Sequence, residues 1–595
     1  MCGIVGISSV EKIKIVELAY DTLKKLEYRG YDSCGIAIGS QDLKLFKKAG
    51  NVENLKKHLD FDDEASVAIG HTRWATHGSV NDSNAHPFIY KNFAMVLNGI
   101  VENYESIKSY LIAKNYHFTS ETDAEALLLY IADYLNDHSL EECIKFIRDN
   151  VEGNFSFLLL NNNDGGLFGM KNGLQLALGI APDLVMIASD KMAFPKQVNE
   201  VMQLENGDAF IIKENNITVI NLDDEVVPRR TFKYEFNSLA IDKNGYETFM
   251  MKEINEQALC GRSLLANYNV NKKVLSTLDK IKKLNVKSIH IIGCGSSYYA
   301  GMQFKSWCRE HFDYNVEVSI ASEFYFYKNF SKADLYILIS QSGETKDTLL
   351  CAEKLSHVRD KLLSIVNSEN STLESLCEMN LAIYAGKEIG VASTKAFFNQ
   401  LLSLFLITNN FLKSKNEASL NYMLDKVEMI CEENLYNKQL ISVLKKSKKI
   451  ILSSRATLYP ITLEIALKVK ELSYISVESI PSGEMKHGSI SLMDEDTSVI
   501  FFITSDCPSF QKILININEV HLRGARVIIV GDKKSIELIG NKAYENVCID
   551  IKNIDLTLQP FLYLIEGQKL SYYLAKELGN NIDMPRNLAK SVTVE

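Results

Sequence analysis

The second half of the chain contains an internal repeat, which limits the folds open to it. Apolar segments typical of buried strands alternate there with helical segments, and six strands are expected to begin near Ser288, Leu335, Leu362, Lys449, Ser498 and Arg526. The offsets from 288 to 449, from 335 to 498 and from 362 to 526 are 161, 163 and 164 residues. Near-equal offsets indicate duplicated units. We therefore predict two tandem α/β doubly wound subdomains, joined by a helical stretch.

The first 220 residues have a different pattern, that of an α+β domain with many strands. Short apolar runs bounded by glycine or asparagine predict strands at Gly35–Ile38, Val67–Ile69, Phe93–Leu97, Phe155–Leu160 and Ala209–Ile212. Amphipathic spacing predicts helices at Glu11–Leu26, Asp123–Asn136 and Leu140–Asn150. A chain of 595 residues is too long for one core, so several domains are expected.

Charged and turn-forming residues mark the boundary between the two parts. They include Asp223-Asp224-Glu225, Pro228-Arg229-Arg230 and Asn244-Gly245. We expect the first domain at residues 1–225, a linker at 226–245, the two repeated subdomains at 246–430 and 431–584, and a C-terminal tail at 585–595.

Composition excludes several classes of function. The net charge of −10 argues against a general nucleic-acid or membrane-surface binder. The 11 cysteines show no CxxC pair, and no export signal precedes them, so we expect reduced thiols in the cytoplasm. The longest apolar stretch, Phe397–Leu412, is interrupted by polar residues and is not expected to cross a membrane.

Cys2 is a candidate nucleophile because of its position. Methionine before a small residue is normally removed in the cytoplasm, which would leave Cys2 with both a thiol and a free α-amine. An α-amine has a pKa of about 8 and can serve as a base near neutral pH. One residue would thus supply nucleophile and base. A buried, unreactive cysteine is the alternative for this residue taken alone.

Three further segments of the first domain carry polar groups at strand or helix ends. The loop from His71 to Gly78 holds Arg73, which suits a carboxylate, beside Trp74. Asn98-Gly99 offers an amide and a backbone N–H to an oxyanion, or forms a plain turn. In Ser120-Glu121-Thr122-Asp123, before a predicted helix, Ser, Thr and Asp are expected as helix caps, and Asp123 could also hold an ammonium group. The histidines at 71, 77 and 86 match no zinc spacing, so we expect no metal.

Together these groups describe a site for the side-chain amide of an amino acid. Cys2-Gly3-Ile4-Val5-Gly6, Tyr28 to Ser33, His71 to Gly78, Asn98-Gly99 and Thr122-Asp123 resemble the class II glutamine amidotransferase domain, an N-terminal-nucleophile fold with an αββα sandwich. The resemblance implies that Cys2 attacks the amide of L-glutamine and that Asn98 and Gly99 hold the oxyanion. It implies that the substrate is bound by Arg73, Trp74, Thr76, His77 and Asp123.

Two loops of the first repeated subdomain join a strand to a helix. They are Gly293-Cys294-Gly295-Ser296-Ser297 and Ser340-Gln341-Ser342-Gly343-Glu344-Thr345. Hydroxyls and N–H groups at a helix N-terminus favour an anion, and ligands bind at the carboxyl ends of parallel strands. A dinucleotide fingerprint and an ATP-binding Gly-Lys-Ser/Thr loop are both missing, so we expect a sugar phosphate. Helix capping by serine is the alternative.

Charged residues of the second subdomain and the tail add candidates for proton transfer. Glu464, Lys468 and Glu471 share one helix face, which also fits a surface ion pair. His487 lies in a loop, where it is either a proton carrier near neutral pH or a surface histidine. With Val391 to Lys395, Glu484 to Gly488 and the tail from Pro585, these segments resemble the sugar-isomerase (SIS) domains of the glutamine–fructose-6-phosphate aminotransferase family.

The second resemblance implies roles for individual residues. The phosphate is bound by Ser297, Ser340, Gln341, Ser342 and Thr345, and the sugar by Val391, Ser393 and Ala589. Lys590 forms a Schiff base with C2 of D-fructose 6-phosphate. His487 opens the sugar ring, Glu471 moves a proton between C1 and C2, and Lys468 lies nearby.

The two resemblances together imply amination and isomerisation of fructose 6-phosphate with internally transferred ammonia. This chemistry needs no cofactor, and similar bacterial enzymes are homodimers. The alternatives are an amidotransferase that makes asparagine or phosphoribosylamine, an enzyme of another sugar phosphate, and a sugar-phosphate sensor without catalysis.

Overall fold

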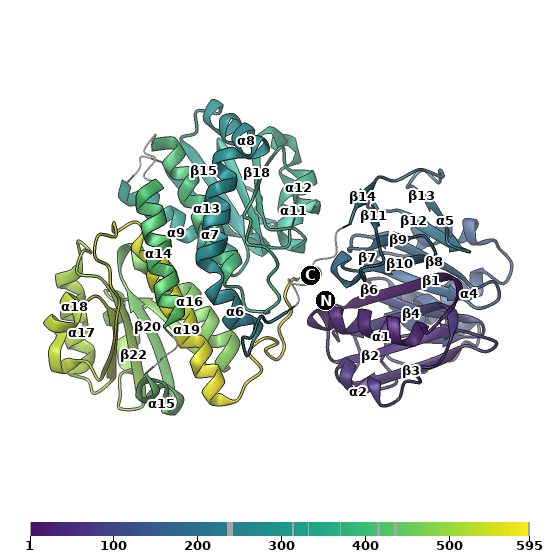
Figure 1. The fold of residues 1–595 in the computed structure, drawn as a ribbon, viewed down its shortest axis with the longest axis horizontal. Coiled ribbons are helices and arrows are strands. Elements are labelled where there is room, and N and C mark those ends of the chain that lie inside the picture. Colours follow the sequence, from purple (N-terminus) through teal and green to yellow (C-terminus); the bar gives the residue numbers. More distant parts are fainter. Residues whose placement is uncertain are drawn as a thin grey trace. The chain divides into compact units, whose positions relative to one another are not determined.

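The computed structural model describes residues 2–75, 77–234, 242–311, 314–330, 332–368, 371–412, 417–433 and 437–592. Its chain forms two compact units (Figure 1). The first comprises Met1–Ser238 with Ser591–Glu595, and the second comprises Leu239–Lys590. Each unit has its own sheets and cores and is described separately.

The first unit contains two mainly antiparallel sheets. Among the described residues, one sheet has eight strands in the order β14-β11-β9-β10-β1-β4-β2-β3, and the other has six in the order β13-β12-β8-β7-β6-β5. The strands are β1 Gly3–Ile13, β2 Ser33–Gly39, β3 Lys44–Ala49, β4 Ala65–Arg73, β5 Phe88–Tyr90, β6 Phe93–Val101, β7 Gly153–Asn161, β8 Gly166–Asn172, β9 Ala177–Ala181, β10 Leu184–Ala188, β11 Glu200–Gln203, β12 Ala209–Lys213, β13 Asn216–Ile220 and β14 Thr231–Lys233.

Helices cover the outer face of each sheet, so the unit has four layers (Figure 1). Apolar residues of the two sheets, such as Ile69 and Leu158, share one central core. A second core lies under α1 (Ile15–Leu26) and α2 (Val52–Lys56). A third lies under α3 (Tyr104–Ala113), α4 (Asp123–Tyr134) and α5 (Leu140–Asn150). The predicted αββα sandwich is confirmed.

The second unit contains two parallel sheets with the same strand order. Among the described residues these are β16-β15-β17-β18-β19 and β21-β20-β22-β23-β24. The strands are β15 Ser288–Gly293, β16 Asn315–Ile320, β17 Leu335–Ser340, β18 Leu362–Val366, β19 Met379–Ala382, β20 Lys449–Ser454, β21 Val477–Pro481, β22 Thr497–Ile503, β23 Arg526–Gly531 and β24 Glu545–Cys548. The predicted pair of doubly wound subdomains is confirmed, because equal strand order is the structural form of the repeat.

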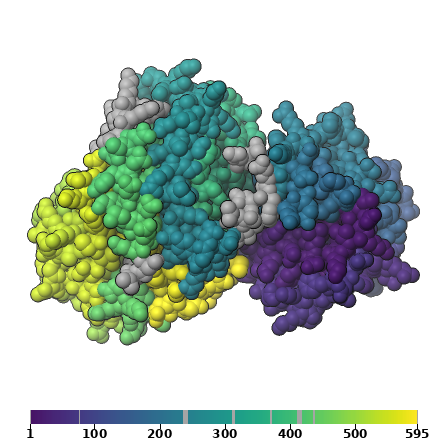
Figure 2. Space-filling view, in the orientation of Figure 1, coloured from purple at the N-terminus to yellow at the C-terminus, as the bar shows by residue number. Residues whose placement is uncertain are grey.

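Helices surround these two sheets and connect the subdomains. They are α6 Phe249–Asn255, α7 Gln257–Val270, α8 Lys272–Lys283, α9 Ser296–His311, α10 Ala321–Phe324, α11 Lys346–Lys354, α12 Thr372–Leu376, α13 Lys395–Leu412, α14 Glu417–Glu432, α15 Lys438–Lys446, α16 Tyr459–Ser473, α17 Phe510–His521, α18 Lys533–Ile539 and α19 Gln559–Leu578. In Figure 2, α7 and α14 lie side by side on the surface, where Arg262 bonds Asp425 and Glu428, each at 2.7 Å.

Two predicted segments differ in detail. The amphipathic run Glu11–Leu26 begins as a strand, since β1 continues to Ile13 and α1 starts at Ile15. Pairing of β1 with β4 overrides the helical pattern in its first residues, because Ile13 lies opposite Ala65. Strand β14 lies inside the stretch expected as a linker and pairs with β11. In the described part of the chain, no helix is long and apolar enough to cross a membrane.

The close contact between α16 and α19 depends on Gly567. A Cβ atom at this position would lie 2.3 Å from Cδ1 of Ile465, whose side chain is fully buried. Because Ile465 has no open space to move into, we predict that Gly567→Ala destabilises the second unit by about 1–3 kcal/mol. Scanning calorimetry measures the effect. Glu577→Ala on the exposed side of α19 serves as the control, and equal melting temperatures for the two variants would contradict the packing account.

Candidate functional site

Cys2 is held in place from three sides just before β1. Its carbonyl oxygen accepts hydrogen bonds from Arg29 Nε at 3.1 Å and from Asn98 Nδ2 at 3.0 Å. Its sulfur accepts one from the Trp74 backbone N–H at 3.2 Å. The following strand β1 pairs with β4 and β10 inside the eight-stranded sheet. The thiol near the chain terminus therefore has a fixed position.

Two glycines allow this close arrangement. A Cβ atom on Gly3 would lie 2.5 Å from Thr72 Oγ1, and one on Gly30 would lie 2.7 Å from the Arg73 carbonyl carbon. A larger residue at either position would push β4 and its loop away from Cys2. The glycines of the Cys-Gly and Arg-Gly-Tyr segments thus have a structural role that spacing alone did not reveal.

Burial is the main influence on the Cys2 thiol and raises its pKa. The positive chain terminus, the Trp74 N–H, Arg73 and Arg29 act in the opposite direction and favour the thiolate. A nucleophile of this kind needs a nearby base to take its proton. The α-amine that removal of Met1 would create is the group closest to it in the covalent structure.

Asn98 and Gly99 lie on β6 with defined orientations. The Asn98 side-chain oxygen is 3.1 Å from His71 Nε2, which also contacts the Leu97 carbonyl oxygen at 2.9 Å. Burial lowers the pKa of His71 to about 3, so its ring is neutral and Nε2–H donates to both oxygens. That bond turns the Asn98 NH₂ group toward Cys2. Gly99 has φ +95°, and a Cβ there would lie 2.1 Å from the Asn154 oxygen.

The histidines at 71 and 86 were considered from the sequence only as metal ligands. In the structure His86 Nδ1 lies 3.3 Å from His71 Nε2, and burial holds the pKa of His86 well below its usual range. The two rings form a buried neutral pair behind Asn98. Among the described residues there is no group of three or more potential metal ligands. His71 on β4 orients Asn98 on β6. This contact joins two strands, so the spacing of residues along the sequence does not reveal it.

The loop after β4 closes around the Arg73 guanidinium. Arg73 donates to the carbonyl oxygens of His77, Gly78 and Ser79, the last two at 3.2 and 3.3 Å. The Asp32 carboxylate accepts from the Ala75 N–H at 2.9 Å. Trp74 packs edge-to-face on Tyr31. Thr76 lies outside the described residues, so its role in glutamine binding stays a prediction.

Asp123 is the first residue of α4 and is buried. Its carboxylate accepts from the Val101 N–H at 2.9 Å, and burial raises its pKa. The helix cap is Thr122, one of the residues expected in that role, since its hydroxyl accepts from the Glu125 N–H. The His77 ring packs against Tyr104, the first residue of α3. The structure thus brings Cys2, Trp74, Asn98 and Arg73 together, while Asp123 and His77 lie at the ends of adjacent elements.

Hydrogen bonds of hydroxyl groups within the loop from β17 to α11 fix its conformation. Ser340 Oγ lies 2.9 Å from Thr345 Oγ1 and accepts from the Gly343 N–H at 3.0 Å. Gly343 has φ +68°, and a Cβ there would lie 2.2 Å from Ser371 Oγ. Ser342 accepts from the Glu344 N–H at 3.1 Å. The loop ends at the N-terminus of α11, where an anion is favoured.

Two buried residues, one beside this loop and one within it, were given no role from the sequence. Gln400 of α13 donates to Ser297 Oγ at 3.1 Å and fixes that hydroxyl at the start of α9. Glu344 accepts from the Thr372 N–H and hydroxyl, both at 2.8 Å, and so joins the loop to α12. Gln341 is partly exposed at the edge of the same loop.

Lys590 near the C-terminus forms a buried ion pair. Its Nζ lies 2.5 Å from Glu388 Oε2 and donates to the Gly390 carbonyl oxygen at 2.7 Å. The two side chains are 6% and 0% exposed, so the pair is almost completely shielded from water. The sequence predicted Lys590 as a reactive residue but did not predict Glu388.

The Glu388 carboxylate lies at the N-terminus of α13, where several donors converge on it. It accepts from the Thr394 N–H at 2.8 Å, the Ala396 N–H at 3.0 Å and the Ser393 hydroxyl at 3.2 Å. Although burial opposes ionisation, Lys590 and these N–H groups hold the pKa of Glu388 below its usual range. The neighbouring Val391 donates its N–H to the Asp583 carbonyl oxygen at 3.0 Å, which links this loop to the tail.

A second buried carboxyl group, Glu253 of α6, approaches the same loop. It accepts from the Ile389 N–H at 2.5 Å and the Gly390 N–H at 3.2 Å. Burial and the nearby negative charge of Glu388 raise the pKa of Glu253 to about 8. The pKa values of the two carboxyl groups are therefore shifted in opposite directions, so Glu388 is ionised and Glu253 is protonated at neutral pH. Such a divergence is typical of functional sites.

The predicted face of α16 is buried rather than exposed. Lys468 Nζ lies 2.6 Å from Glu471 and 3.4 Å from Glu464, and Glu464 accepts from Ser296 at 3.0 Å. Lys468 and Glu464 are 1% and 0% exposed. Burial raises the pKa of Glu464 to about 7, while the two carboxylates keep the pKa of Lys468 above its usual range. A plain surface ion pair is therefore excluded.

His487 ends the 3₁₀ turn Met485–His487 and is exposed. Its ring makes no hydrogen bond or ion pair with other described residues of the chain. Among the described residues, His487 therefore has no hydrogen bond or ion pair with Lys590 or Glu471. Ala589 is partly buried beside Lys590 in the tail. Upstream, the Arg586 N–H donates to the Tyr474 hydroxyl at 2.8 Å, which anchors the tail on the end of α16.

The protonation of Glu253 predicts a pH dependence of stability. Its folded pKa of about 8 lies above the unfolded value, so between about pH 4.5 and 8 only the folded state keeps the proton. Stability should fall with rising pH in this window, by at most about 1.4 kcal/mol per pH unit. Glu253→Gln imitates the protonated acid and should reduce this fall, as measured by calorimetry from pH 5 to 9. Glu247→Gln, at an exposed carboxylate, is the control. An unchanged slope in Glu253→Gln would contradict the assignment.

Comparison with known proteins identifies one domain model in the first unit and another in the second. A glutamine amidotransferase domain model matches residues 71–196, and an SIS domain model matches residues 284–409 and 443–577. The C-terminal domain of glucosamine-fructose-6-phosphate aminotransferase from Francisella tularensis is 31% identical, with a TM-score of 0.51, over 57% of this chain and 99% of its own. A tagatose-6-phosphate ketose/aldose isomerase from Escherichia coli, 18% identical over 58% of this chain and 96% of its own with a TM-score of 0.51, shows the same fold.

Full-length relatives connect the two parts. The glutamine–fructose-6-phosphate aminotransferases (isomerizing) of Chlorobaculum tepidum and Aquifex aeolicus are 37% and 36% identical, and in both cases the comparison covers 100% of both chains. This identity extends over the amidotransferase domain and both SIS domains in one order. The chain therefore belongs to the glutamine–fructose-6-phosphate aminotransferase (isomerizing) family.

Proposed function

We propose that this protein is an enzyme that converts D-fructose 6-phosphate and L-glutamine into D-glucosamine 6-phosphate and L-glutamate. The names of full-length relatives support the overall reaction. The observation that carries the proposal is the buried lysine of the C-terminal tail, whose Nζ lies 2.5 Å from Glu388 in the SIS unit. A lysine held in this way is suited to covalent attachment of a sugar carbonyl.

The first half of the reaction takes place at Cys2. After removal of Met1, the free α-amine accepts the thiol proton, and the sulfur attacks the side-chain amide carbon of glutamine. Asn98 and Gly99 stabilise the negative oxygen of the tetrahedral intermediate. When the C–N bond breaks, the amine returns the proton and ammonia leaves. Water then hydrolyses the thioester, which releases glutamate and regenerates the thiol.

Substrate binding in this half is assigned to the loop after β4 and the start of α4. Arg73 carries the positive charge for the α-carboxylate of glutamine, and Asp123 carries the negative charge for its α-ammonium group. Trp74, Thr76 and His77 complete the glutamine site in this proposal. The three carbonyl oxygens bound by Arg73 fix the position of its guanidinium, so its positive charge has a defined place in the site.

The second half takes place around Lys590. The phosphate of the sugar binds the hydroxyls and N–H groups of Ser297, Ser340, Gln341, Ser342 and Thr345. Val391, Ser393 and Ala589 line the sugar. Glu388 accepts a proton from the Lys590 ammonium group, and the free amine adds to C2 with loss of water to form an imine. Ammonia then displaces the lysine at C2.

Proton transfer completes the isomerisation. Glu471 removes and returns a proton between C1 and C2, and the ion pair with Lys468 at 2.6 Å fixes its carboxylate. His487 acts as the acid–base group of ring opening. The proposal requires no cofactor, since imine formation, amide hydrolysis and the proton shift use only groups of the protein chain, the substrates and water. It also includes transfer of ammonia within the protein, a homodimer and a cytoplasmic location, as the family resemblance implies.

The test is product analysis with glutamine and fructose 6-phosphate. Cys2→Ala should lower glutamine-dependent formation of glucosamine 6-phosphate at least about a thousandfold, because it removes the nucleophile. The same variant should keep ammonia-dependent synthesis within about threefold of the wild type, since the SIS site is unchanged. Liquid chromatography with mass spectrometry quantifies both products.

Cys548→Ala is the matched control, because Cys548 is an exposed cysteine of the SIS unit. Its activity with glutamine should equal that of the wild type. Undiminished product from glutamine in Cys2→Ala would refute the nucleophile. Turnover of a different sugar phosphate in place of fructose 6-phosphate would favour an enzyme of that sugar. Binding of fructose 6-phosphate with no product from either nitrogen source would favour a sensor.

A further inference from the structure

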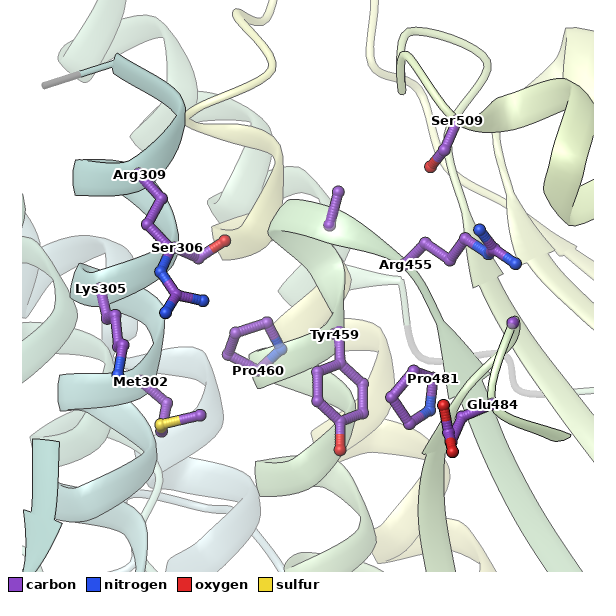
Figure 3. Close-up of a pocket in the computed structure, with 12 residues that line it drawn as sticks. Met302, Lys305, Ser306, Arg309, Arg455, Tyr459, Pro460, Pro481, Glu484 and Ser509 are labelled. Carbon is purple, nitrogen blue, oxygen red and sulfur yellow. The ribbon is translucent and has the colours of Figure 1, made fainter. Parts of the chain in front are cut away.

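A cavity lies between helix α9 and the second SIS subdomain. It has a volume of about 610 Å³, and its wall includes Lys305, Ser306, Arg309, Arg455, Tyr459 and Glu484. Figure 3 shows Lys305 and Arg309 on helix α9 at one side, with Arg455 and Glu484 on loops at the opposite side. Cavities of about 300–1,000 Å³ suit small-molecule ligands. The cavity shares no lining residue with the site around Lys590.

Three positive side chains meet at this cavity without a carboxylate partner. Among the described residues, no acidic side chain forms an ion pair with Lys305, Arg309 or Arg455. Arg455 donates through Nη2 to the Asn516 side-chain oxygen at 3.0 Å, and its buried Nε has no partner in the described part of the chain. Burial and the like charge of Arg309 lower the pKa of Lys305. In a protein of net charge −10, such a group of cations favours an anionic ligand.

The internal repeat relates this cavity to the predicted sugar-phosphate site. The loop after β15 turns at Gly295 with φ +54°, and the loop after β20 turns at Ala456 with φ +52°. These two residues are 161 positions apart, the same offset as the starts of β15 and β20. A left-handed conformation is unfavourable for alanine, so the second loop keeps the shape of the first at a cost.

Helix α16 borders the predicted sugar-phosphate site, and helix α9, its counterpart in the first subdomain, borders the cavity. Helix α16 supplies Glu464, Lys468 and Glu471 beside the first site. The side chains that α9 contributes to the cavity wall are Met302, Lys305, Ser306 and Arg309, and none of them is a carboxylate. On the α9 side the cavity therefore has no base comparable to Glu471, which suits binding of a sugar phosphate without a proton shift between C1 and C2.

The loop after β22 corresponds to the Ser340–Thr345 loop after β17, but its donor groups are used differently. Pairing of β17 and β22 with their neighbours places Ser342 and Ser505 at corresponding positions. Ser505 donates both its N–H, at 2.7 Å, and its hydroxyl, at 2.9 Å, to Asp532. These donors are thus used within the protein. Recognition of an anion in this cavity consequently depends on Lys305, Arg309 and Arg455, with hydroxyls of Ser306 and Tyr459 and the Glu484 carboxylate available to a polyol.

We propose that this cavity is a second, non-catalytic binding site for a phosphate monoester of a polyol, such as a sugar phosphate. The phosphate group binds between the cations of α9 and Arg455, and the hydroxyl groups of the polyol contact the opposite wall. This site goes beyond the proposed reaction, which uses the first SIS subdomain, α16, His487 and the C-terminal tail.

Equilibrium dialysis of the full-length protein with radiolabelled sorbitol 6-phosphate tests the proposal. This probe carries the phosphate and the polyol but no carbonyl, so it cannot react with Lys590. The wild type should bind two equivalents per chain. Lys305→Gln/Arg309→Gln should weaken one of them at least about tenfold while leaving synthesis of glucosamine 6-phosphate unchanged. Ser340→Ala/Thr345→Ala should weaken the other and abolish synthesis.

Lys534→Gln/Lys542→Gln is the control, because it removes two exposed lysines outside the cavity and should keep both equivalents. One equivalent in the wild type, or two unweakened equivalents in Lys305→Gln/Arg309→Gln, would overturn the second site. Inorganic phosphate is the comparison probe. If it binds the second site as tightly as sorbitol 6-phosphate, recognition of the polyol is overturned. Absence of both equivalents would instead contradict the proposed function.

Discussion

The buried ion pair between Lys590 and Glu388 is the interaction on which the arrangement of the SIS unit depends. Removing two charges from water is costly, and the cost is offset only when the geometry is good and other donors satisfy the carboxylate. Glu388 meets that condition through N–H groups of Thr394 and Ala396 and the Ser393 hydroxyl. A lysine five residues from the C-terminus is thereby fixed inside the fold instead of fraying.

The same principle holds at the other end of the chain. Cys2 would be mobile if β1 did not lie between β4 and β10, and its carbonyl oxygen is bound by Arg29 and Asn98. In each unit, a reactive side chain near a terminus is held by residues distant in sequence. Both functional groups are partly desolvated, which strengthens the electrostatic interactions around them.

The elements and the family could be predicted from the sequence, but the groups that support the reactive residues could not. Strand starts at Ser288 and Leu335 follow from local apolar runs, and the order of strands follows from the repeat. Glu388 and Glu253 lie in segments without a distinctive pattern, and their pKa values depend on burial and on each other. Likewise, His71 orients Asn98 across two strands, and Lys468 is buried only because α16 packs against α9 and α19.

Covalent trapping measures the central claim, that Lys590 is the sugar-binding amine and Glu388 its proton acceptor. The protein is incubated with fructose 6-phosphate without glutamine, reduced with sodium borohydride, digested and mapped by mass spectrometry. The account predicts one hexitol-phosphate adduct on the peptide that contains Lys590, and much slower trapping in Glu388→Gln. An adduct on Lys468 or Lys395 instead, or no adduct at all in a folded protein that binds the sugar, would contradict it.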